Sequence, residues 1–153
     1  MLMFSALLKG TSAQDYAKDV FQTDAGNIEI TFIAHGTLMI QFNGKTFHID
    51  PVTMFGTDYS QMPKADVILI THAHGDHMDA KAVGDISTEN TLLISNADVV
   101  KALGKGTVMA NGDAKSFQDF TIKAVPAYNL ASSYHPKGIG NGYVLTMGGK
   151  NIY

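Results

Sequence analysis

Hydrophobic and polar residues alternate through the first third of the chain. Residues 28–33 (Ile-Glu-Ile-Thr-Phe-Ile) and 37–42 alternate with a period of two, which is typical of strands with one buried face. Asn43-Gly44 then separates residues 37–42 from residues 45–49. Because Asn-Gly favours the positive φ angles of a type I′ turn, we predict a β-hairpin over residues 37–49 within an antiparallel sheet.

From residue 67 onward the pattern changes to short apolar runs separated by helical segments. Residues 67–70 (Val-Ile-Leu-Ile) and 91–95 have the composition of fully buried strands. Helices are predicted over residues 79–85 and, with Asn96 as N-cap, through Leu103. Further strands are predicted over residues 106–110, 120–125, 142–147 and 150–153, with a long loop over residues 127–140. This succession of strands and helices predicts an α/β fold.

Length and composition describe one globular domain. The 153 residues are 45% hydrophobic and 16% charged, which is enough apolar material for a core. The net charge of -3 provides no broad basic surface, so we do not expect nucleic acid as a partner. The chain contains no cysteine, which excludes disulfides and thiolate metal sites. Any metal would have to be bound by histidines and carboxylates.

The N-terminus is apolar over residues 1–8, and Thr11-Ser-Ala13 supplies small residues of the kind that precede a signal-peptidase cut. We therefore expect residues 1–14 to be a trimmed signal peptide and the protein to be periplasmic or secreted. The alternative is a short surface helix on a cytoplasmic protein. No apolar stretch approaches the roughly 20 residues of a membrane-spanning helix, so no transmembrane segment is expected.

The run Thr71-His-Ala-His-Gly-Asp-His77 directly follows the apolar residues 67–70 and has the composition of a metal site. Imidazole and carboxylate groups are suitable ligands for Zn²⁺ and neighbouring transition metals. The candidate ligands are His72, His74, Asp76 and His77. Two cations about 3.5–4 Å apart could share a water molecule and lower its pKa towards about 7. Asp76 could accept the proton of that water as the catalytic residue. A solvated polar loop is the alternative, but three of the six histidines lie within this run beside an acid.

Residues 71–77 match the THxHxDH signature of the metallo-β-lactamase superfamily, which the chain resembles from about residue 28 to residue 153. His35-Gly-Thr and Asp50-Pro51 are similar to segments of the lactonase-like branch of that superfamily. The resemblance implies an αββα four-layer sandwich, of which this chain would form the first half. It also implies Zn²⁺ as cofactor, with one or two ions, and with Mn²⁺ or Fe²⁺ as alternatives.

The resemblance assigns the ligands to two metal ions. In the superfamily, two histidines of the signature and one from a later loop bind the first ion, and the Asp-His pair of the signature binds the second. His72 and His74 therefore correspond to the first ion, and Asp76 and His77 to the second. The later histidine is expected to be His135, because the segment Tyr134-His-Pro-Lys137 resembles a Phe-His-Pro-Lys segment of lactonase-like members.

Three further residues are interpreted with alternatives. Asp50 is expected to orient a metal ligand by hydrogen bonding, or else to cap the turn before Pro51. His35 is expected to line the cavity and contact substrate, or else to be a hydrogen-bonded core histidine. His48 lies between two apolar residues of a strand and is expected on the surface rather than at the metal.

The sequence departs from the superfamily pattern in its last part, because the bridging Asp and the final His ligand have no counterpart here. We therefore expect residues 15–153 to be a truncated metallo-β-lactamase-like domain that binds at most one zinc tightly. We also expect an uncovered apolar sheet face that promotes homo-oligomerisation or aggregation.

Together these features predict a metal-dependent hydrolase. It would use a zinc-activated water on an ester, lactone or phosphodiester-type bond of a small-molecule substrate, with a lactonase-like activity favoured. The alternative is a half-domain that binds metal or a partner chain without catalysis, because the bridging carboxylate is missing. A nuclease is disfavoured by the net charge.

Overall fold

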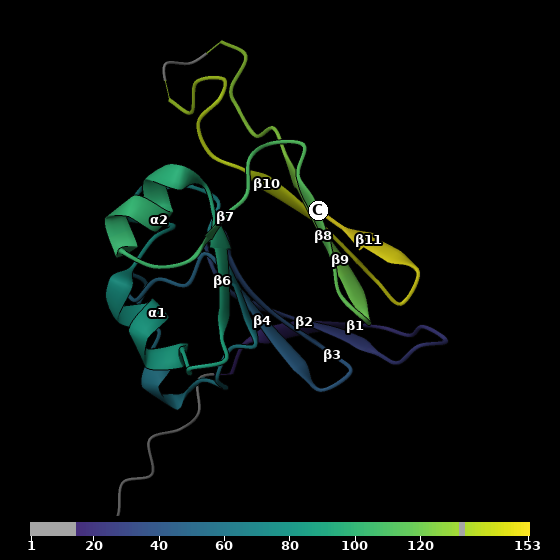
Figure 1. The fold of residues 1–153 in the computed structure, drawn as a ribbon. Helices are drawn as coiled ribbons and strands as arrows, with labels where there is room; N and C mark the ends of the chain where they lie inside the picture. Colours follow the sequence, from purple (N-terminus) through teal and green to yellow (C-terminus); the bar gives the residue numbers. More distant parts are fainter. Residues whose placement is uncertain (1–14, 132–133) are drawn as a thin grey trace, which may run out of the picture.

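The computed structural model describes residues 15–131 and 134–153, and the predicted signal peptide over residues 1–14 lies outside them. In these residues the chain forms three layers (Figure 1). Two short α-helices cover one face of a seven-stranded sheet, and a four-stranded sheet packs against the other face. On the side away from the helices the β10–β11 turn approaches the β1–β2 turn so closely that a side chain on Gly148 would clash with Thr23.

The seven-stranded sheet follows the order of the sequence. Its strands are β1 (Ala17–Phe21), β2 (Ile28–Ala34), β3 (Thr37–Phe42), β4 (Lys45–Ile49), β5 (Val67–Leu69), β6 (Leu92–Ser95) and β7 (Thr107–Val108). Strands β1 to β4 are antiparallel, whereas β4 to β7 are parallel. Asn43 and Gly44 have φ angles of 48° and 71°, which confirms the predicted type I′ hairpin between β3 and β4.

The parallel strands are connected by the helices α1 (Ala80–Ile86) and α2 (Ala97–Leu103), and a 3₁₀ turn, η1 (Tyr59–Gln61), precedes β5. Asp79 caps α1 by accepting from the backbone N–H groups of Lys81 and Ala82. Asn96 caps α2 as predicted, because its side chain accepts from Val99 N at 3.0 Å. The helices pack on the sheet through buried Val83, Ile86 and Val99, among others.

The four-stranded sheet contains β8 (Ala114–Ser116), β9 (Phe120–Val125), β10 (Gly142–Met147) and β11 (Lys150–Ile152), all antiparallel. Its inner face buries Phe120, Ile122 and Leu145 against residues of the first sheet such as Phe47 and Leu69. The loop between β9 and β10, predicted as a long loop over residues 127–140, projects beyond the two sheets at the top of the view, on the side of β7 and α2 (Figure 1).

The prediction that His48 lies on the surface is wrong. Its side chain is fully buried on the helix-facing side of β4, 6.1 Å between ring centres from Tyr59 of η1. Nε2 lies 3.0 Å from the carbonyl oxygen of Pro63, and Nδ1 has no hydrogen-bond partner among the described residues. Burial lowers the pKa of His48 to about 4. The strand alternation placed His48 on the correct face, but only the packing of η1 covers that face.

The predicted α/β architecture is confirmed, with helices on one side of two packed sheets. The sequence pattern missed β1 and β8 because their residues are all exposed, so neither strand has an alternating apolar face. Within the described residues no helix is both long enough and apolar enough to cross a bilayer.

Candidate metal centre

The histidine run forms a tight turn immediately after β5. The backbone N–H groups of His77 and Met78 both donate to the carbonyl oxygen of His74, at 3.0 and 2.8 Å. This turn lies at the carboxyl ends of the parallel strands, which is the usual location of ligand sites in α/β sheets. The run therefore projects several polar side chains into the space below the β9–β10 loop.

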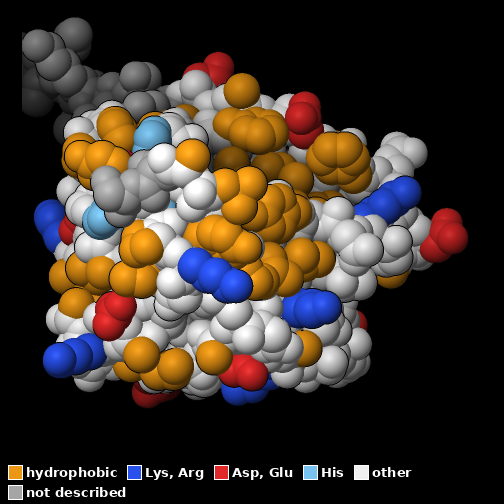
Figure 2. Space-filling view, turned by 90° about the horizontal axis from the view of Figure 1, so that it is seen from above, with side chains coloured by type: hydrophobic (Ala, Val, Ile, Leu, Met, Phe, Trp, Pro, Cys, Tyr) orange, Lys and Arg blue, Asp and Glu red, His pale blue; other side chains and the backbone are white. Residues whose placement is uncertain are grey.

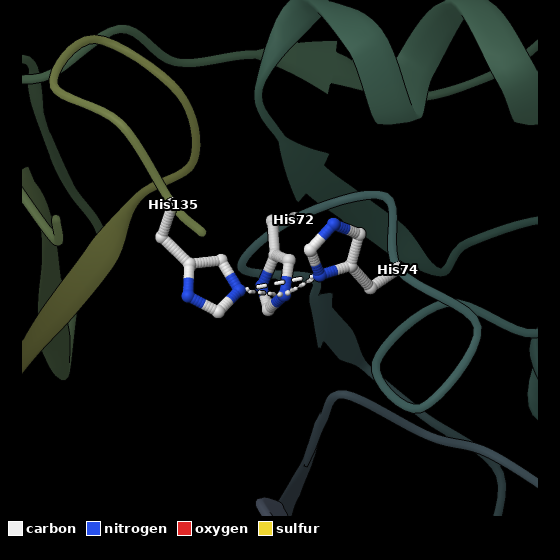
Figure 3. Close-up of side chains that lie close together, drawn as sticks. All are labelled: His72, His74 and His135. Atoms are coloured by element: carbon white, nitrogen blue, oxygen red, sulfur yellow. Dashed lines mark hydrogen bonds between the residues drawn. The ribbon is translucent and has the colours of Figure 1, made fainter. Parts of the chain in front are cut away.

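Three imidazoles converge there (Figure 3). His135 Nε2 lies 3.1 Å from His72 Nε2 and 3.2 Å from His74 Nδ1, and the last two atoms are 3.2 Å apart. The histidines come from two segments: His72 and His74 from the turn after β5, and His135 from the β9–β10 loop. The backbone at Gly140 approaches His72 so closely that a side chain there would lie 3.3 Å from His72 Cβ.

This triangle of nitrogens fits a cation better than it fits hydrogen bonds. Each ring nitrogen carries either one proton or one lone pair in the ring plane, so three nitrogens cannot all hydrogen-bond to one another. A tetrahedral zinc site with Zn–N distances of about 2.0–2.1 Å places its ligand nitrogens about 3.3–3.4 Å apart. The observed separations of 3.1–3.2 Å are close to that spacing. His72, His74 and His135 therefore form a donor set suited to one divalent cation.

A second group contains His35, Asp76 and His77, whose ligand atoms all lie within 4.8 Å of one another. Asp76 Oδ2 is 3.3 Å from His35 Nε2 and 3.7 Å from His77 Nε2. His35 belongs to the turn between β2 and β3, so this group also joins two distant segments. The rings of His72 and His77 are 4.1 Å apart between centres, which places the two groups side by side.

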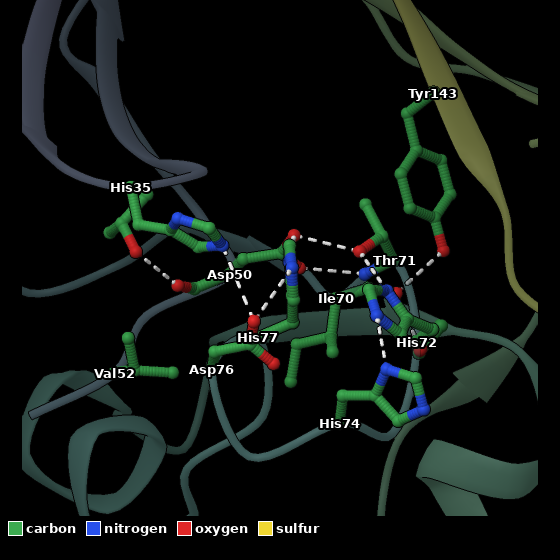
Figure 4. A network of polar contacts seen from close by, with 12 residues as sticks. His35, Asp50, Val52, Ile70, Thr71, His72, His74, Asp76, His77 and Tyr143 are labelled. Atoms are coloured by element: carbon green, nitrogen blue, oxygen red, sulfur yellow. Dashed lines mark hydrogen bonds and ion pairs between the residues drawn. The ribbon is translucent and has the colours of Figure 1, made fainter. Parts of the chain in front are cut away.

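Asp50 holds both groups in place from behind (Figure 4). Its buried carboxylate accepts from Thr71 N, from Thr71 Oγ1 and from His77 Nδ1, each at 2.7 Å. Thr71 Oγ1 also lies 2.9 Å from His72 Nδ1. Because the hydroxyl proton of Thr71 is donated to Asp50, His72 Nδ1 must carry a proton and donate to Thr71. Asp50 thus keeps a proton on Nδ1 of both rings, directly for His77 and through Thr71 for His72. The Nε2 lone pair of His72 then faces the three-histidine group, and that of His77 faces Asp76.

The surroundings shift the proton affinities of these side chains. Burial lowers the pKa of His72 to about 4, so this imidazole stays neutral in the folded protein over most of the acidic range. The hydrogen bond to Asp50 raises the pKa of His77. Desolvation opposes ionisation of Asp76, but a backbone hydrogen bond and the nearby His77 and His35 outweigh it and lower the pKa of that carboxyl.

A cleft of about 530 Å³ extends from the histidines between the two sheets. Its polar end is formed by His72, His77 and His135, and its walls by apolar residues of both sheets, namely Leu38, Ile40, Ile49, Leu145 and Ile152. Figure 2 shows a wide group of hydrophobic side chains beside histidines on this face. Tyr143 at the base of the cleft donates to the carbonyl oxygen of Ile70 at 3.1 Å, and burial raises the pKa of Tyr143 to about 12.

The structure brings together every residue that the sequence singled out for the site. His72, His74 and His135 form one group, Asp76 and His77 belong to the other, and Asp50 lies behind both. His35, expected to contact substrate or else to be a hydrogen-bonded core histidine, lies beside Asp76 with about half of its side chain exposed, and its contact with substrate stays a prediction. Sequence reasoning missed Thr71, which links Asp50 to His72. Its place directly before the first histidine of the run was the available signal.

Comparisons with known proteins identify the family of this chain. Residues 29–153 match the family described as the Beta-lactamase superfamily domain. A UPF0173 metal-dependent hydrolase from Flavobacterium johnsoniae is 33% identical over 139 residues, which cover 82% of this chain and 60% of the relative. The chain thus spans about 60% of the length of the curated relatives it matches.

Solved structures show the same fold. A protein from Parabacteroides distasonis, provisionally named a metal-dependent hydrolase, superposes with a TM-score of 0.87 at 43% identity, covering 91% of this chain and 65% of that chain. Igni18, a metallo hydrolase from Ignicoccus hospitalis, superposes with a TM-score of 0.61 at 21% identity, covering 82% of this chain and 58% of that one. The family match over residues 29–153, together with this fold, shows that the chain belongs to the metallo-β-lactamase superfamily.

Proposed function

We propose that this chain carries the metal centre of a metal-dependent hydrolase with a lactonase-like preference for small esters or lactones. The observation that carries the proposal is the convergence of His72 Nε2, His74 Nδ1 and His135 Nε2 at 3.1–3.2 Å. The relatives named as metal-dependent hydrolases support the same reaction class. Zn²⁺ is the proposed cofactor, with Mn²⁺ and Fe²⁺ as alternatives that suit the same ligands.

Each residue of the site has its own role in the proposed reaction. His72, His74 and His135 would hold a divalent cation, which when bound polarises a carbonyl oxygen and lowers the pKa of a water molecule. Asp76 is ionised at neutral pH, because its pKa is lowered, and about two fifths of its side chain is exposed to the solvent from which that water comes. We assign Asp76 the role of proton acceptor for the attacking water. Asp50 keeps the ring of His77 oriented throughout.

The cleft supports the choice of substrate class. Its volume of about 530 Å³ lies within the range of about 300–1,000 Å³ that is common for small-molecule sites. Apolar walls favour a hydrocarbon chain or ring over a phosphorylated sugar, because burying a charged phosphate against such walls is unfavourable. A lactone or ester places its polar bond at the histidines and its hydrocarbon part between the sheets.

The test is hydrolysis of three generic substrates by the zinc-loaded chain: p-nitrophenyl butyrate, γ-butyrolactone and bis-p-nitrophenyl phosphate. We expect turnover of the ester and the lactone that is lost with chelator and with His74→Ala, and retained in the surface control Lys81→Ala. Turnover of the phosphodiester alone would contradict the substrate class. Zinc binding without any turnover would favour the non-catalytic half-domain instead.

A further inference from the structure

The three-histidine group depends on a contact between two segments that are far apart in the sequence. His72 and His74 lie in the turn after β5, whereas His135 belongs to the β9–β10 loop. A cation binds most tightly where its ligands are already close together, because ordering a loop during binding costs free energy. The residues that fix the loop to the turn therefore help to set the affinity of the group for a cation.

Asn141 lies at the junction of these two segments. It is the last residue of the β9–β10 loop, directly before β10, and it is buried. Its backbone N–H donates to the carbonyl oxygen of Thr71 at 2.8 Å. Thr71 directly precedes His72, and Asn141 follows His135 by six positions. This hydrogen bond thus connects the loop to the turn close to a ligand on each side.

The side chain of Asn141 holds that backbone in place. Its Nδ2 donates to the carbonyl oxygen of Met109 at 2.8 Å and to the hydroxyl oxygen of Tyr143 at 3.1 Å. The Tyr143 hydroxyl donates in turn to the carbonyl oxygen of Ile70 (Figure 4). Met109 directly follows β7, and Ile70 directly follows β5. One amide group thus connects the start of β10 to the carboxyl ends of two parallel strands in the other sheet.

The chain between Asn141 and His135 is compact. The backbone N–H of Ile139 donates to the carbonyl oxygen of Pro136 at 3.2 Å, which closes a turn directly after His135. Gly140 has a φ angle of 80°, which lets the backbone bend from this turn to Asn141. Because so few residues separate the two positions, a displacement of Asn141 should also displace His135.

The turn after β5 has other supports, which do not involve the side chain of Asn141. Asp50 accepts from the backbone N–H and the hydroxyl of Thr71. Nδ2 of Asn96 donates to the carbonyl oxygen of Thr71 at 3.1 Å. Loss of the Asn141 side chain should therefore displace His135 and leave the two histidines of the turn in place.

We propose that Asn141 is a positioning residue of the metal centre, whose side chain holds His135 within binding distance of the two histidines of the turn. The proposal rests on the proposed function, because it requires a divalent cation at the three-histidine group. Asn141 acts on the cation through His135, and Tyr143 supports Asn141 by accepting one of its two amide protons.

A double-mutant cycle on zinc affinity tests this role, with calorimetry of the 153-residue protein. The variants are Asn141→Leu, which has a similar shape but no hydrogen-bonding group, His135→Asn, and the combination of both. We expect Asn141→Leu to weaken zinc binding about 10-fold when His135 is present and less than about 2-fold in the His135→Asn background. A residue that only stabilised the fold would weaken binding equally in both backgrounds.

The ¹⁵N chemical shifts of the imidazoles test the same role without a cycle. When zinc is added to Asn141→Leu, the Nε2 signal of His72 should move as in the wild type, and that of His135 should move less. Thr91→Val is the matched control, because the Thr91 hydroxyl also donates to a buried carbonyl oxygen, that of Ala65 at 2.7 Å. Thr91 lies at the opposite end of the parallel strands, so this variant should bind zinc as the wild type does.

Unchanged zinc affinity in Asn141→Leu, or equal weakening in both backgrounds, would overturn the proposal. If Asn141→Leu does not fold, Tyr143→Phe decides by the same cycle, because it removes only the oxygen that accepts from Asn141. We expect it to weaken zinc binding about 2–10-fold when His135 is present and not in its absence, and equal effects would again overturn the proposal. These results leave the proposed function intact, whereas a wild type that binds no zinc would refute that function and this proposal together.

Discussion

The substitution Asp50→Asn tests whether one buried carboxylate organises both metal groups. Asp50 accepts three hydrogen bonds of 2.7 Å, two from Thr71 and one from His77. An asparagine has the same shape and tolerates the φ angle of 47° at this position, so the backbone should not change. However, the amide replaces one acceptor oxygen with an N–H₂ group, which has no lone pair for these donors.

Both orientations of the new amide are unfavourable. If its oxygen faces His77 and the Thr71 hydroxyl, its N–H₂ group meets the backbone N–H of Thr71. If it is reversed, the hydroxyl must turn and donate to His72 Nδ1, which moves the proton of His72 to Nε2 and blocks that nitrogen as a ligand. Loss of a hydrogen bond to a charged group plus one buried unsatisfied donor lowers the free energy of unfolding by about 2–4 kcal/mol. Zinc affinity should fall about 10–100-fold.

Urea unfolding of the metal-free protein and zinc calorimetry measure these two effects. Asp66→Asn is the matched control, because Asp66 also accepts from a backbone N–H, that of Thr46 at 2.9 Å, and from a side chain, that of Lys45 at 2.8 Å. It lies away from the metal groups, so zinc affinity should not change. An Asp50→Asn protein that binds zinc as tightly as the wild type would refute the idea that Asp50 sets the orientation and protonation of the ligands.

Three further predictions concern other parts of the molecule. The pKa of buried His48 is about 4 when folded and about 6.5 when unfolded, so its contribution to stability is complete above pH 6.5 and is lost as the pH falls towards 4. Between pH 7 and pH 5, the free energy of unfolding of the metal-free wild type should therefore fall by about 2 kcal/mol more than that of His48→Gln, as measured by urea unfolding. Equal decreases in the two proteins would contradict a buried, neutral His48. Gly36→Ala should displace His77, weaken zinc binding and lower the free energy of unfolding by about 1 kcal/mol, whereas Gly84→Ala, which meets nothing within 4 Å, should leave zinc binding unchanged. If Gly36→Ala binds zinc normally, the close contact with His77 is not needed. Light scattering should detect oligomers, because the apolar cleft is open and the edge strand β1 is exposed along its length, and a stable monomer would count against association through these surfaces.

Local sequence chemistry was sufficient for most of the secondary structure and for half of the site. The Asn43-Gly44 hairpin and the helix capped by Asn96 depend only on neighbouring residues, and both were predicted correctly. His72, His74, Asp76 and His77 lie within one turn, so their spacing already indicated metal binding. The strand β1 escaped prediction because it pairs only through its backbone at a sheet edge, with no buried face to leave a pattern.

The sequence by itself determined the order of strands and helices and the metal-binding character of the turn after β5, because these depend on side chains close together along the chain. The resemblance to a known superfamily had indicated His135 and Asp50 as distant members of the site, but only the tertiary structure showed how such residues meet. It brought His135 within 3.1 Å of His72 across 63 positions of sequence, set His35 beside Asp76, and buried His48 under η1. Such contacts depend on how two sheets and their loops pack, and no local pattern of residues encodes that packing.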